Sequence, residues 1–303
     1  MSGIKKWRKH IGLFSMTLPG MLLLFAFSYL PMFGIVIAFK NYRAVDGIWG
    51  SEWVGLDNFK YLFYSSDALQ ITYNTLFLNF LFIVSGLVFS VTLALMMNEV
   101  KNKLLNRIYQ SSYFFPYILS WVIVGYITFT LLRMDNGLLN NLLVYLQFDP
   151  IQWYAEAKYW PAILTIVNAW KVTGYLSIIY LAGMLGISHE YYEAAKIDGA
   201  SRLKQIFYIT LPLLMPLIII MTLLQIGKIF YSDFGLFYNI TRDSGLLYDS
   251  ADVIDTYVFR MMRKVGDVGM ASAAGFYQAV VGFILVLLSN AIVKKLDRDS
   301  ALF

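Results

Sequence analysis

Six long apolar runs constrain the fold of this chain more than any other feature. Each is at least 21 residues long and, as a helix, can cross the roughly 30 Å of a bilayer's hydrocarbon core. Lipid offers the backbone no hydrogen-bond partners, and the runs are too long for barrel strands, so helices are expected. The runs cover residues 13–39, 71–97, 109–132, 160–185, 211–231 and 271–293. The sequence therefore predicts an all-α polytopic membrane protein with six transmembrane helices.

Composition supports this class and argues against several others. Hydrophobic residues make up 59% of the chain and charged residues 14%, far from the balance of a soluble domain. The net charge of +5 lies largely in short loops, so membrane topology explains it better than nucleic-acid binding does. There is no cysteine, and the two histidines, His10 and His189, lie far apart in polar segments. We therefore expect no disulfide, no thiol chemistry and no metal site.

Lysine and arginine residues are distributed unevenly between alternate loops. Thirteen of the 24 fall before the first run, after the second and fourth runs, and after the sixth. Nine fall in the longer loops of the other side, where Arg260, Arg263 and Lys264 weaken the bias locally. Because basic loops tend to stay in the cytoplasm, both chain ends are expected there. The expected parts are a cytoplasmic N-terminal segment (1–12), a transmembrane domain (13–293) and a cytoplasmic tail (294–303).

A polar loop of residues 186–211 separates the fourth and fifth runs on the expected cytoplasmic side. Ser188 can cap a short helix, Glu190 places a carboxylate where the helix dipole favours it, and Gly199 can end the helix in a left-handed conformation. Ala194 and Ala195 present almost no side chain, so another backbone could approach closely. The loop is suited to docking a partner protein, although an ordinary amphipathic interfacial loop is the alternative.

The spacing within this loop matches a known signature. Glu193-Ala194-Ala195 is followed after three residues by Gly199, after nine more by Ile209, and then by Leu211-Pro212. This order resembles the signature loop of permease subunits in ATP-binding-cassette (ABC) importers. The resemblance implies a type I permease fold whose cytoplasmic coupling helix docks on an ATPase. The residues it implies for coupling are Glu190, Glu193, Ala194, Ala195, Asp198, Gly199, Ile209, Leu211 and Pro212.

Further stretches resemble the permeases of oligosaccharide importers of the maltose-transporter type. They are Tyr29–Phe39, Val54–Phe59, Lys228–Tyr238, Asp252–Arg260 and the ending Ala301-Leu302-Phe303. This resemblance implies ATP-driven import of oligosaccharides across a bacterial cytoplasmic (inner) membrane, with lipid around the chain. The implied partners are a second, different permease, two ABC ATPase subunits and an extracytoplasmic sugar-binding protein.

Nucleotide binding is expected on other chains. The sequence has no GxxxxGK[ST] phosphate loop, so it cannot cradle a nucleotide in that way. ATP and magnesium are therefore expected on the ATPase subunits, and this chain is not expected to be an enzyme.

The last outer segment, residues 232–270, is the most charged part of the outer face. It either contacts the binding protein or is only solvated.

Polar residues within the expected spans are costly in lipid and mark candidates for a solute pathway. On the fourth run, Asn168, Lys171 and Tyr175 follow i, i+3, i+7 spacing, and on the fifth run Gln225 and Lys228 lie three apart. Such donors beside aromatic rings suit sugar hydroxyls, whereas snorkelling lysines and amides that join helices are the structural alternative. The candidate pathway residues are Asn168, Trp170, Lys171, Tyr175, Gln225, Lys228 and Tyr231.

Three other functions are alternatives to sugar import. An ABC permease for a peptide or a phosphorylated compound is the nearest alternative. A secondary transporter would use intramembrane carboxylates, which the expected spans hardly contain. A membrane enzyme would need an acid or metal cluster at one interface, and the sequence pattern indicates none.

Overall fold

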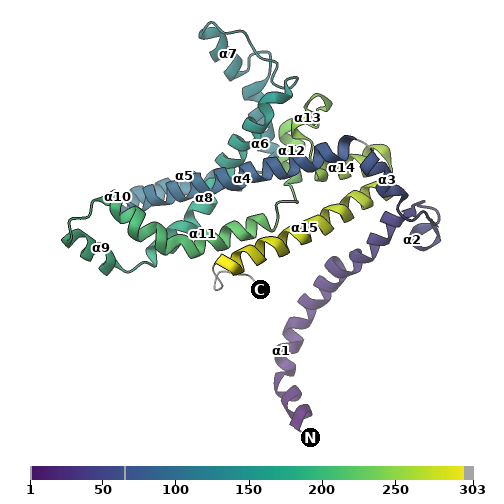
Figure 1. Cartoon of the computed structure of the whole chain (residues 1–303), viewed down its shortest axis with the longest axis horizontal. Coiled ribbons are helices and arrows are strands. Elements are labelled where there is room, and N and C mark those ends of the chain that lie inside the picture. The colour runs from purple at the N-terminus through teal and green to yellow at the C-terminus, as the bar shows by residue number, and fades with distance from the viewer. Residues whose placement is uncertain (1, 65, 297–303) are drawn as a thin grey trace. The chain divides into compact units, whose positions relative to one another are not determined.

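The structure is a computed structural model that describes residues 2–64 and 66–296, with the side chains of residues 12–60, 62–64 and 67–295. The described chain is mostly helical (Figure 1). Its internal contacts divide it into a first unit, residues 1–65 with 258–277, and a second unit, residues 66–257 with 278–303. Arg298, the ending Ala301-Leu302-Phe303 and the side chain of His10 lie outside the described residues.

The first unit begins with one long helical stretch. α1 (Ser2–Leu24) continues through η1 (Phe25–Tyr29) and η2 (Leu30–Phe39), and residues 12–39 are long and apolar enough to cross a membrane. β1 (Lys40–Asn41) then pairs antiparallel with β2 (Glu52–Trp53) beyond α2 (Gly47–Gly50). α3 (Asp57–Tyr64) follows.

The second unit contains most of the helices, and Figure 1 shows its long members lying side by side. Its elements up to the polar loop are α4 (Ser66–Asn98), α5 (Lys103–Ile118), α6 (Trp121–Leu132), α7 (Leu138–Tyr145), η3 (Ala157–Tyr159), α8 (Trp160–Leu185), α9 (His189–Ile197) and α10 (Arg202–Gln205). They are followed by η4 (Ile206–Thr210), α11 (Leu211–Ile226), α12 (Phe234–Thr241), η5 (Gly245–Leu247) and α13 (Tyr248–Ala251). The elements shared by the two units are α14 (Ile254–Arg260) and α15 (Val268–Leu296), with η6 (Met261–Val265) between them in the first unit.

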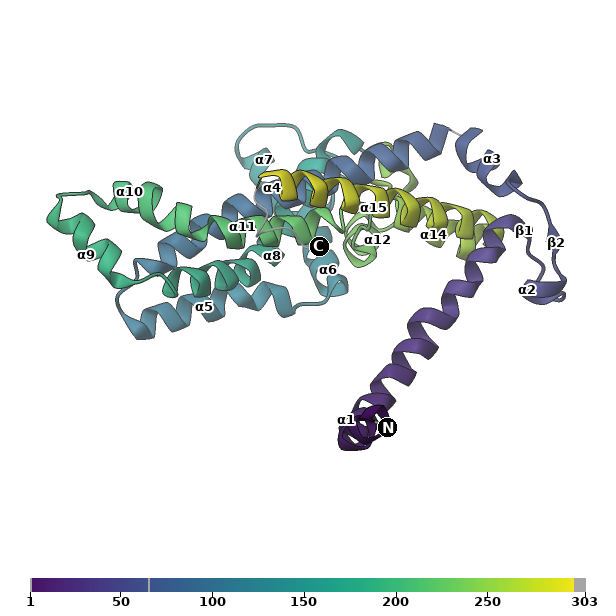
Figure 2. The ribbon, with the colours of Figure 1, turned by 60° about the horizontal axis from the view of Figure 1, so that its bottom comes forward.

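α8 is the central helix of the second unit. It packs along α4 and also contacts α5 and α11 (Figures 1 and 2). One apolar core, which includes Trp160, Leu164 and Phe237, surrounds the start of α8. A second core, which includes Tyr180 and Leu214, surrounds its end. α8 is thus packed against several neighbours along its length, and densely packed side chains resist displacement.

The six expected apolar runs are recovered in the described residues, with two corrections. The fifth run was expected to continue to residue 231, but its helix α11 ends at Ile226, so Lys228 and Tyr231 lie beyond it. Five helices are long and apolar enough to span a membrane, and the run 109–132 corresponds to α5 and α6. The expectation of one continuous span there was wrong, because the two helices meet at an angle of 94°. Leu119 and Ser120 are extended, with ψ angles of 137° and 151°, and the Ser120 side chain caps α6 by accepting from the Ile123 N–H. This local N-cap starts a new helix in the middle of the run.

Gly174 sets the closest approach between α8 and α5. A Cβ atom added at this glycine would lie 1.8 Å from the carbonyl oxygen of Tyr113 and 2.5 Å from its carbonyl carbon. The obstacle is backbone, which cannot rotate away as a side chain could. Small residues at helix crossings allow such contacts between membrane helices, so the α5–α8 packing requires glycine here.

We expect Gly174→Val to lower the thermal denaturation midpoint of the purified protein in detergent. Forcing the two backbones apart should cost about 1–3 kcal/mol or more, as overpacking does in other cores. Gly86→Ala is the matched control, because a Cβ atom there would meet only Leu176 Cδ1, at 3.8 Å. Alanine within a helix is favoured over glycine by up to about 1 kcal/mol, so the control should match or exceed the wild type. A wild-type midpoint for Gly174→Val would contradict the tight crossing.

Candidate functional site

The polar loop between α8 and α11 folds as two short helices, and their ends are set by the capping serines and the glycine expected from the sequence. The Ser188 hydroxyl accepts from the N–H of Glu190 at 3.3 Å and caps α9, and the Ser201 hydroxyl accepts from the N–H of Lys204 and caps α10. Gly199 has a φ of +71°, and the N–H of Ala200 donates to the carbonyl of Ala195 at 2.8 Å. The capped start and the left-handed end expected for this helix are both confirmed.

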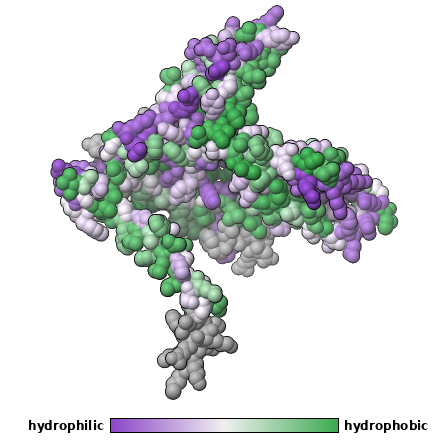
Figure 3. Space-filling view, turned by 180° about the vertical axis from the view of Figure 1, so that it is seen from behind, coloured by the Kyte–Doolittle hydropathy of each residue, from purple (hydrophilic) through white to green (hydrophobic). Residues whose placement is uncertain are grey.

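α9 lies on the surface of the second unit. None of its residues is buried, and the space-filling view shows hydrophilic residues gathered at the end of the unit that carries α9 and α10 (Figure 3). Glu190, Glu193, Ala194 and Asp198 are exposed, and Ala195 is half-buried. The exposed surface of the helix therefore carries acidic and small residues, together with Tyr191, Lys196 and Ile197.

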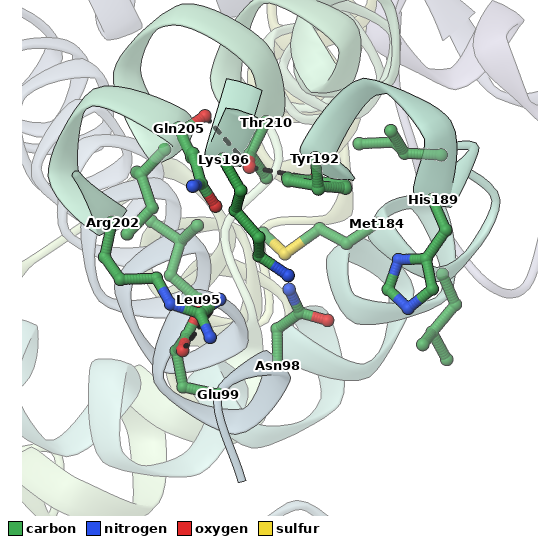
Figure 4. Close-up of a pocket in the computed structure, with 13 residues that line it drawn as sticks. Leu95, Asn98, Glu99, Met184, His189, Tyr192, Lys196, Arg202, Gln205 and Thr210 are labelled. Carbon is green, nitrogen blue, oxygen red and sulfur yellow. Dashed lines mark hydrogen bonds and ion pairs between the residues drawn. The ribbon is translucent and has the colours of Figure 1, made fainter. Parts of the chain in front are cut away.

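Side chains of α9, α10 and the bundle surround a pocket of about 440 Å³ (Figure 4). Across it, Arg202 forms an ion pair with Glu99 at the end of α4, with 3.6 Å between Nη1 and Oε2. The Tyr192 hydroxyl and the Thr210 hydroxyl are 3.0 Å apart and share a hydrogen bond. These contacts join α9 to the start of α11 and α10 to the end of α4, so the loop is tied to the bundle on both sides.

The contacts of this loop include residues that the sequence did not single out. Thr210 is buried between the predicted Ile209 and Leu211, which are half-buried, and Pro212 lies at the first turn of α11. The pairing of Arg202 with Glu99 spans more than a hundred positions, and no local pattern indicates it. Both of its side chains are about half exposed, so the pair contributes at most about 1 kcal/mol.

A second cavity, of about 380 Å³, lies between α4, α8 and α11. It brings together four of the seven candidate pathway residues: Asn168, Gln225, Lys228 and Tyr231. Asn79 and Asp233 add an amide and a carboxylate to its lining. The Nε2 atom of Gln225 is buried and has no hydrogen-bond partner among the described atoms. The cavity therefore offers amide, ammonium, phenol and carboxylate groups to a polar solute.

The other three candidates lie outside this cavity. Trp170 lines a separate, largely apolar cavity of about 580 Å³ between α4, α5 and α8. The Tyr175 ring stacks on Tyr117 of α5 with 4.4 Å between centroids. Lys171 is buried and donates to the carbonyl of Tyr117 at 2.8 Å. The stripe expected on α8 thus divides between two neighbours, because Asn168 faces the cavity while Lys171 and Tyr175 contact α5.

A buried polar network adjoins the cavity. The Asn79 amide donates to Ser232 Oγ and to the carbonyl of Ile229, each at 3.0 Å. Asp255 Oδ2 accepts from the Ser232 N–H at 2.8 Å and from Gln278 Nε2 at 3.0 Å. The network therefore connects α4, the segment after α11, α14 and the second-unit part of α15. Within the described residues, no group of three or more His, Asp or Glu side chains is placed to hold a metal ion.

Comparison with known proteins identifies the family. The family model described as the binding-protein-dependent transport system inner membrane component matches residues 86–298. The chain belongs to this family. Protein LplB of Bacillus subtilis is 36% identical over 287 residues, which cover 95% of this chain and 90% of that protein. The polygalacturonan/rhamnogalacturonan transport system permease protein YteP of the same organism is 36% identical over 287 residues, 95% of this chain and 89% of the relative.

A solved structure extends the similarity to the whole fold. It is a bacterial alginate ABC transporter in complex with an alginate pentasaccharide-bound periplasmic protein, and one of its chains matches with a TM-score of 0.89. The sequences are 31% identical, and the match covers 98% of each chain. The expectation of a multi-pass ABC importer permease is therefore confirmed, and the chain is a transport component of a family whose members are permeases rather than enzymes.

Asp255 makes the stability of the permease depend on pH. Burial raises the pKa of the Asp255 carboxyl above its usual 3.8, while the hydrogen bonds from Ser232 and Gln278 oppose the rise. The folded state then binds this proton more tightly than the unfolded state does. Stability from this group is therefore fully present below pH 3.8 and is lost as pH rises through the folded-state pKa.

We expect Asp255→Asn to remove this dependence, because the amide keeps an oxygen acceptor but cannot ionise. The thermal denaturation midpoint of the wild type should fall relative to that of the variant as the pH is raised from about 4 to about 7. Asp249→Asn, at an exposed position, is the control and should follow the wild-type profile. Parallel profiles for the wild type and Asp255→Asn would contradict the assignment.

Proposed function

We propose that this chain is the transmembrane permease subunit of an ATP-driven importer of oligosaccharides delivered by an extracytoplasmic solute-binding protein. The observation that carries the proposal is the cavity between α8 and α11, because these two helices are also joined by the α9–α10 loop. A solute site and a docking loop on the same pair of helices allow a separate ATPase subunit to be coupled to the solute pathway. The relatives named for polygalacturonan and alginate transport support a sugar as the solute.

The proposed assembly contains further subunits, which complete the membrane pathway, hydrolyse ATP and deliver the solute. They are a second, different permease, two ABC ATPase subunits that bind ATP and magnesium, and the sugar-binding protein. The proposed location is the bacterial cytoplasmic membrane, with both chain ends and the α9–α10 loop in the cytoplasm. The basic residues of the inner loops support this orientation.

In this proposal α9 is the coupling helix. Glu193 contacts a basic residue of the ATPase, with Glu190 and Asp198 nearby, and Ala194 and Ala195 allow close seating. Gly199 sets the turn into α10, and Ile209, Leu211 and Pro212 carry the loop into α11. The exposure of the acidic residues of α9 and the ties to Glu99 and Thr210 support the arrangement.

The proposed solute pathway is lined by Asn168, Gln225, Lys228 and Tyr231. Amides and a phenol can exchange hydrogen bonds with sugar hydroxyls, and the buried Gln225 Nε2 has no hydrogen-bond partner among the described atoms. The exposed Lys228 ammonium suits a carboxylate, and alginate and polygalacturonan are polymers of uronic acids. We therefore assign acidic oligosaccharides as the solute class.

The proposed cycle follows from the connection between loop and cavity. ATP binding closes the two ATPase subunits, which displaces α9 and, through it, α8 and α11. The cavity opens to the outside, the binding protein releases its sugar, and hydrolysis restores the state that opens inward. A secondary transport mechanism has less support, since Asp233 is the one carboxylate lining the cavity and it is already bonded to Trp121.

The coupling role predicts the behaviour of Gly199→Val in the reconstituted importer. Valine is strained by about 1–3 kcal/mol at a φ near +71°, so the turn between α9 and α10 should change. We expect uptake to fall at least tenfold while the subunits still assemble and ATP is still hydrolysed. Gly245→Ala, where an added Cβ would meet its nearest atom at 3.9 Å, should keep near-normal uptake. Unchanged coupling in Gly199→Val would contradict the proposed role of the loop.

The solute class predicts which loaded binding protein stimulates ATP hydrolysis. Uronate oligosaccharides should stimulate it, whereas neutral oligosaccharides, peptides and phosphorylated sugars should stimulate it less. Lys228→Gln should lower uptake of the acidic oligosaccharides about tenfold, because a hydrogen bond to a charged group contributes about 1.5–3 kcal/mol. Lys158→Gln, which removes an exposed lysine outside the cavity, is the control. Stimulation by peptides or phosphorylated compounds alone would overturn the sugar assignment.

A further inference from the structure

The bend between α5 and α6 leaves backbone carbonyls without helical partners inside an apolar run. Helix α5 ends at Ile118 and α6 begins at Trp121, so the last carbonyls of α5 cannot bond to N–H groups one turn ahead. The N–H of Leu119 reaches the carbonyl of Pro116 at 3.2 Å and satisfies one of them in part. In lipid, the remaining carbonyls need other donors.

Lys171 supplies these donors from α8. Its side chain is 7% exposed, and its Nζ atom donates to the carbonyls of Pro116 (3.3 Å), Tyr117 (2.8 Å) and Leu119. An ammonium has three N–H donors, so three carbonyls occupy all of them. A cation at the carboxyl end of a helix also interacts favourably with the helix dipole. No donor is left for a solute.

The aromatic surroundings of Lys171 extend this contact to the cavity wall. The Nζ atom lies 5.0 Å from the centroid of the Trp121 ring and 5.7 Å from that of Tyr117, which offsets part of the cost of burying the charge. Trp121 is the first residue of α6, and its Nε1 donates to Asp233 Oδ2 at 2.6 Å. Asp233 lines the cavity and caps α12. The bend, α8 and the cavity wall therefore meet around one side chain.

We propose that Lys171 is a positioning residue, whose ammonium holds the bend between α5 and α6 and thereby fixes the direction of α6. This role replaces direct solute contact for Lys171. The importance of Lys171 for transport rests on the proposed function. Its role in holding the geometry of the bend does not depend on that function.

Distance measurements between spin labels test the proposal directly. The chain has no cysteine, so cysteines introduced at Ile108 on α5 and Tyr126 on α6, which are 50% and 74% exposed, are its only thiols and can carry the labels. The full-length protein is measured in lipid nanodiscs with the subunits that purify with it. The wild type and Lys171→Arg, which keeps the charge and the donors, should give one narrow distance distribution. Lys171→Met should at least double its width.

Matched variants decide the outcome. Lys228→Met removes a lysine that does not contact the bend and should keep the wild-type distribution. If Lys171→Met does not fold, Lys171→Gln takes its place, since its amide has two donors and no charge, and it should also broaden the distribution. A wild-type distribution for the neutral variant, or a Lys171→Arg distribution as broad as the neutral one, overturns the proposal.

Uptake by the assembled importer connects the bend to transport. The neutral variant should lower the maximal uptake rate at least fivefold, and Lys171→Arg should restore it to within twofold of the wild type. Unchanged uptake in a variant with a broadened distribution would overturn the positioning role. Because the distances require neither solute nor nucleotide, they can contradict the role of Lys171 while the proposed import function stands.

Discussion

A backbone carbonyl in lipid must find a donor within the protein, and the bend between α5 and α6 is where this chain meets that requirement without a helix. The 94° angle exposes the last carbonyls of α5, and the buried ammonium of Lys171 bonds to two of them, Pro116 and Tyr117, and to the carbonyl of Leu119 in the bend. A buried charge is expensive unless it is fully paired. Here the cost of the unpaired carbonyls and the cost of the buried ammonium offset each other, because the carbonyls and the ammonium bond to one another. The bend and Lys171 therefore require each other. The close crossing at Gly174, one turn further along α8, brings the two helices near enough for this contact.

The parts of the fold and of the candidate site that the sequence could predict are those determined by residues close together in the chain. Spans are set by the thickness of the bilayer, so the apolar runs sufficed to find them. The loop was equally predictable, because a cap by Ser188 and a left-handed turn at Gly199 involve only neighbouring residues. The family resemblance rested on the same residues, and the match over residues 86–298 confirmed it.

What the sequence could not predict depends on contacts between distant segments. An apolar run has the same composition whether its helix is straight or bent. The donor that bonds to the carbonyls of the bend, Lys171, lies on another helix. The i, i+3, i+7 spacing placed Asn168, Lys171 and Tyr175 on one broad face, but the sequence did not say that this face borders both the cavity and α5. The pairing of Asn79 with Ser232, more than 150 positions away, has no local pattern either.

The connection between loop and cavity depends on packing more than on charge. The exposed pair of Arg202 and Glu99 is weak, whereas α8 and α11 continue without interruption from the loop to residues that line the cavity. A Cβ atom at Gly183 of α8 would lie 2.5 Å from Leu217 and 2.9 Å from Leu214 of α11, so the two helices are in close contact near the loop. Densely packed interiors transmit displacement because they resist compression. In the proposed cycle, this close packing is what passes a movement of α9 to α8 and α11 together.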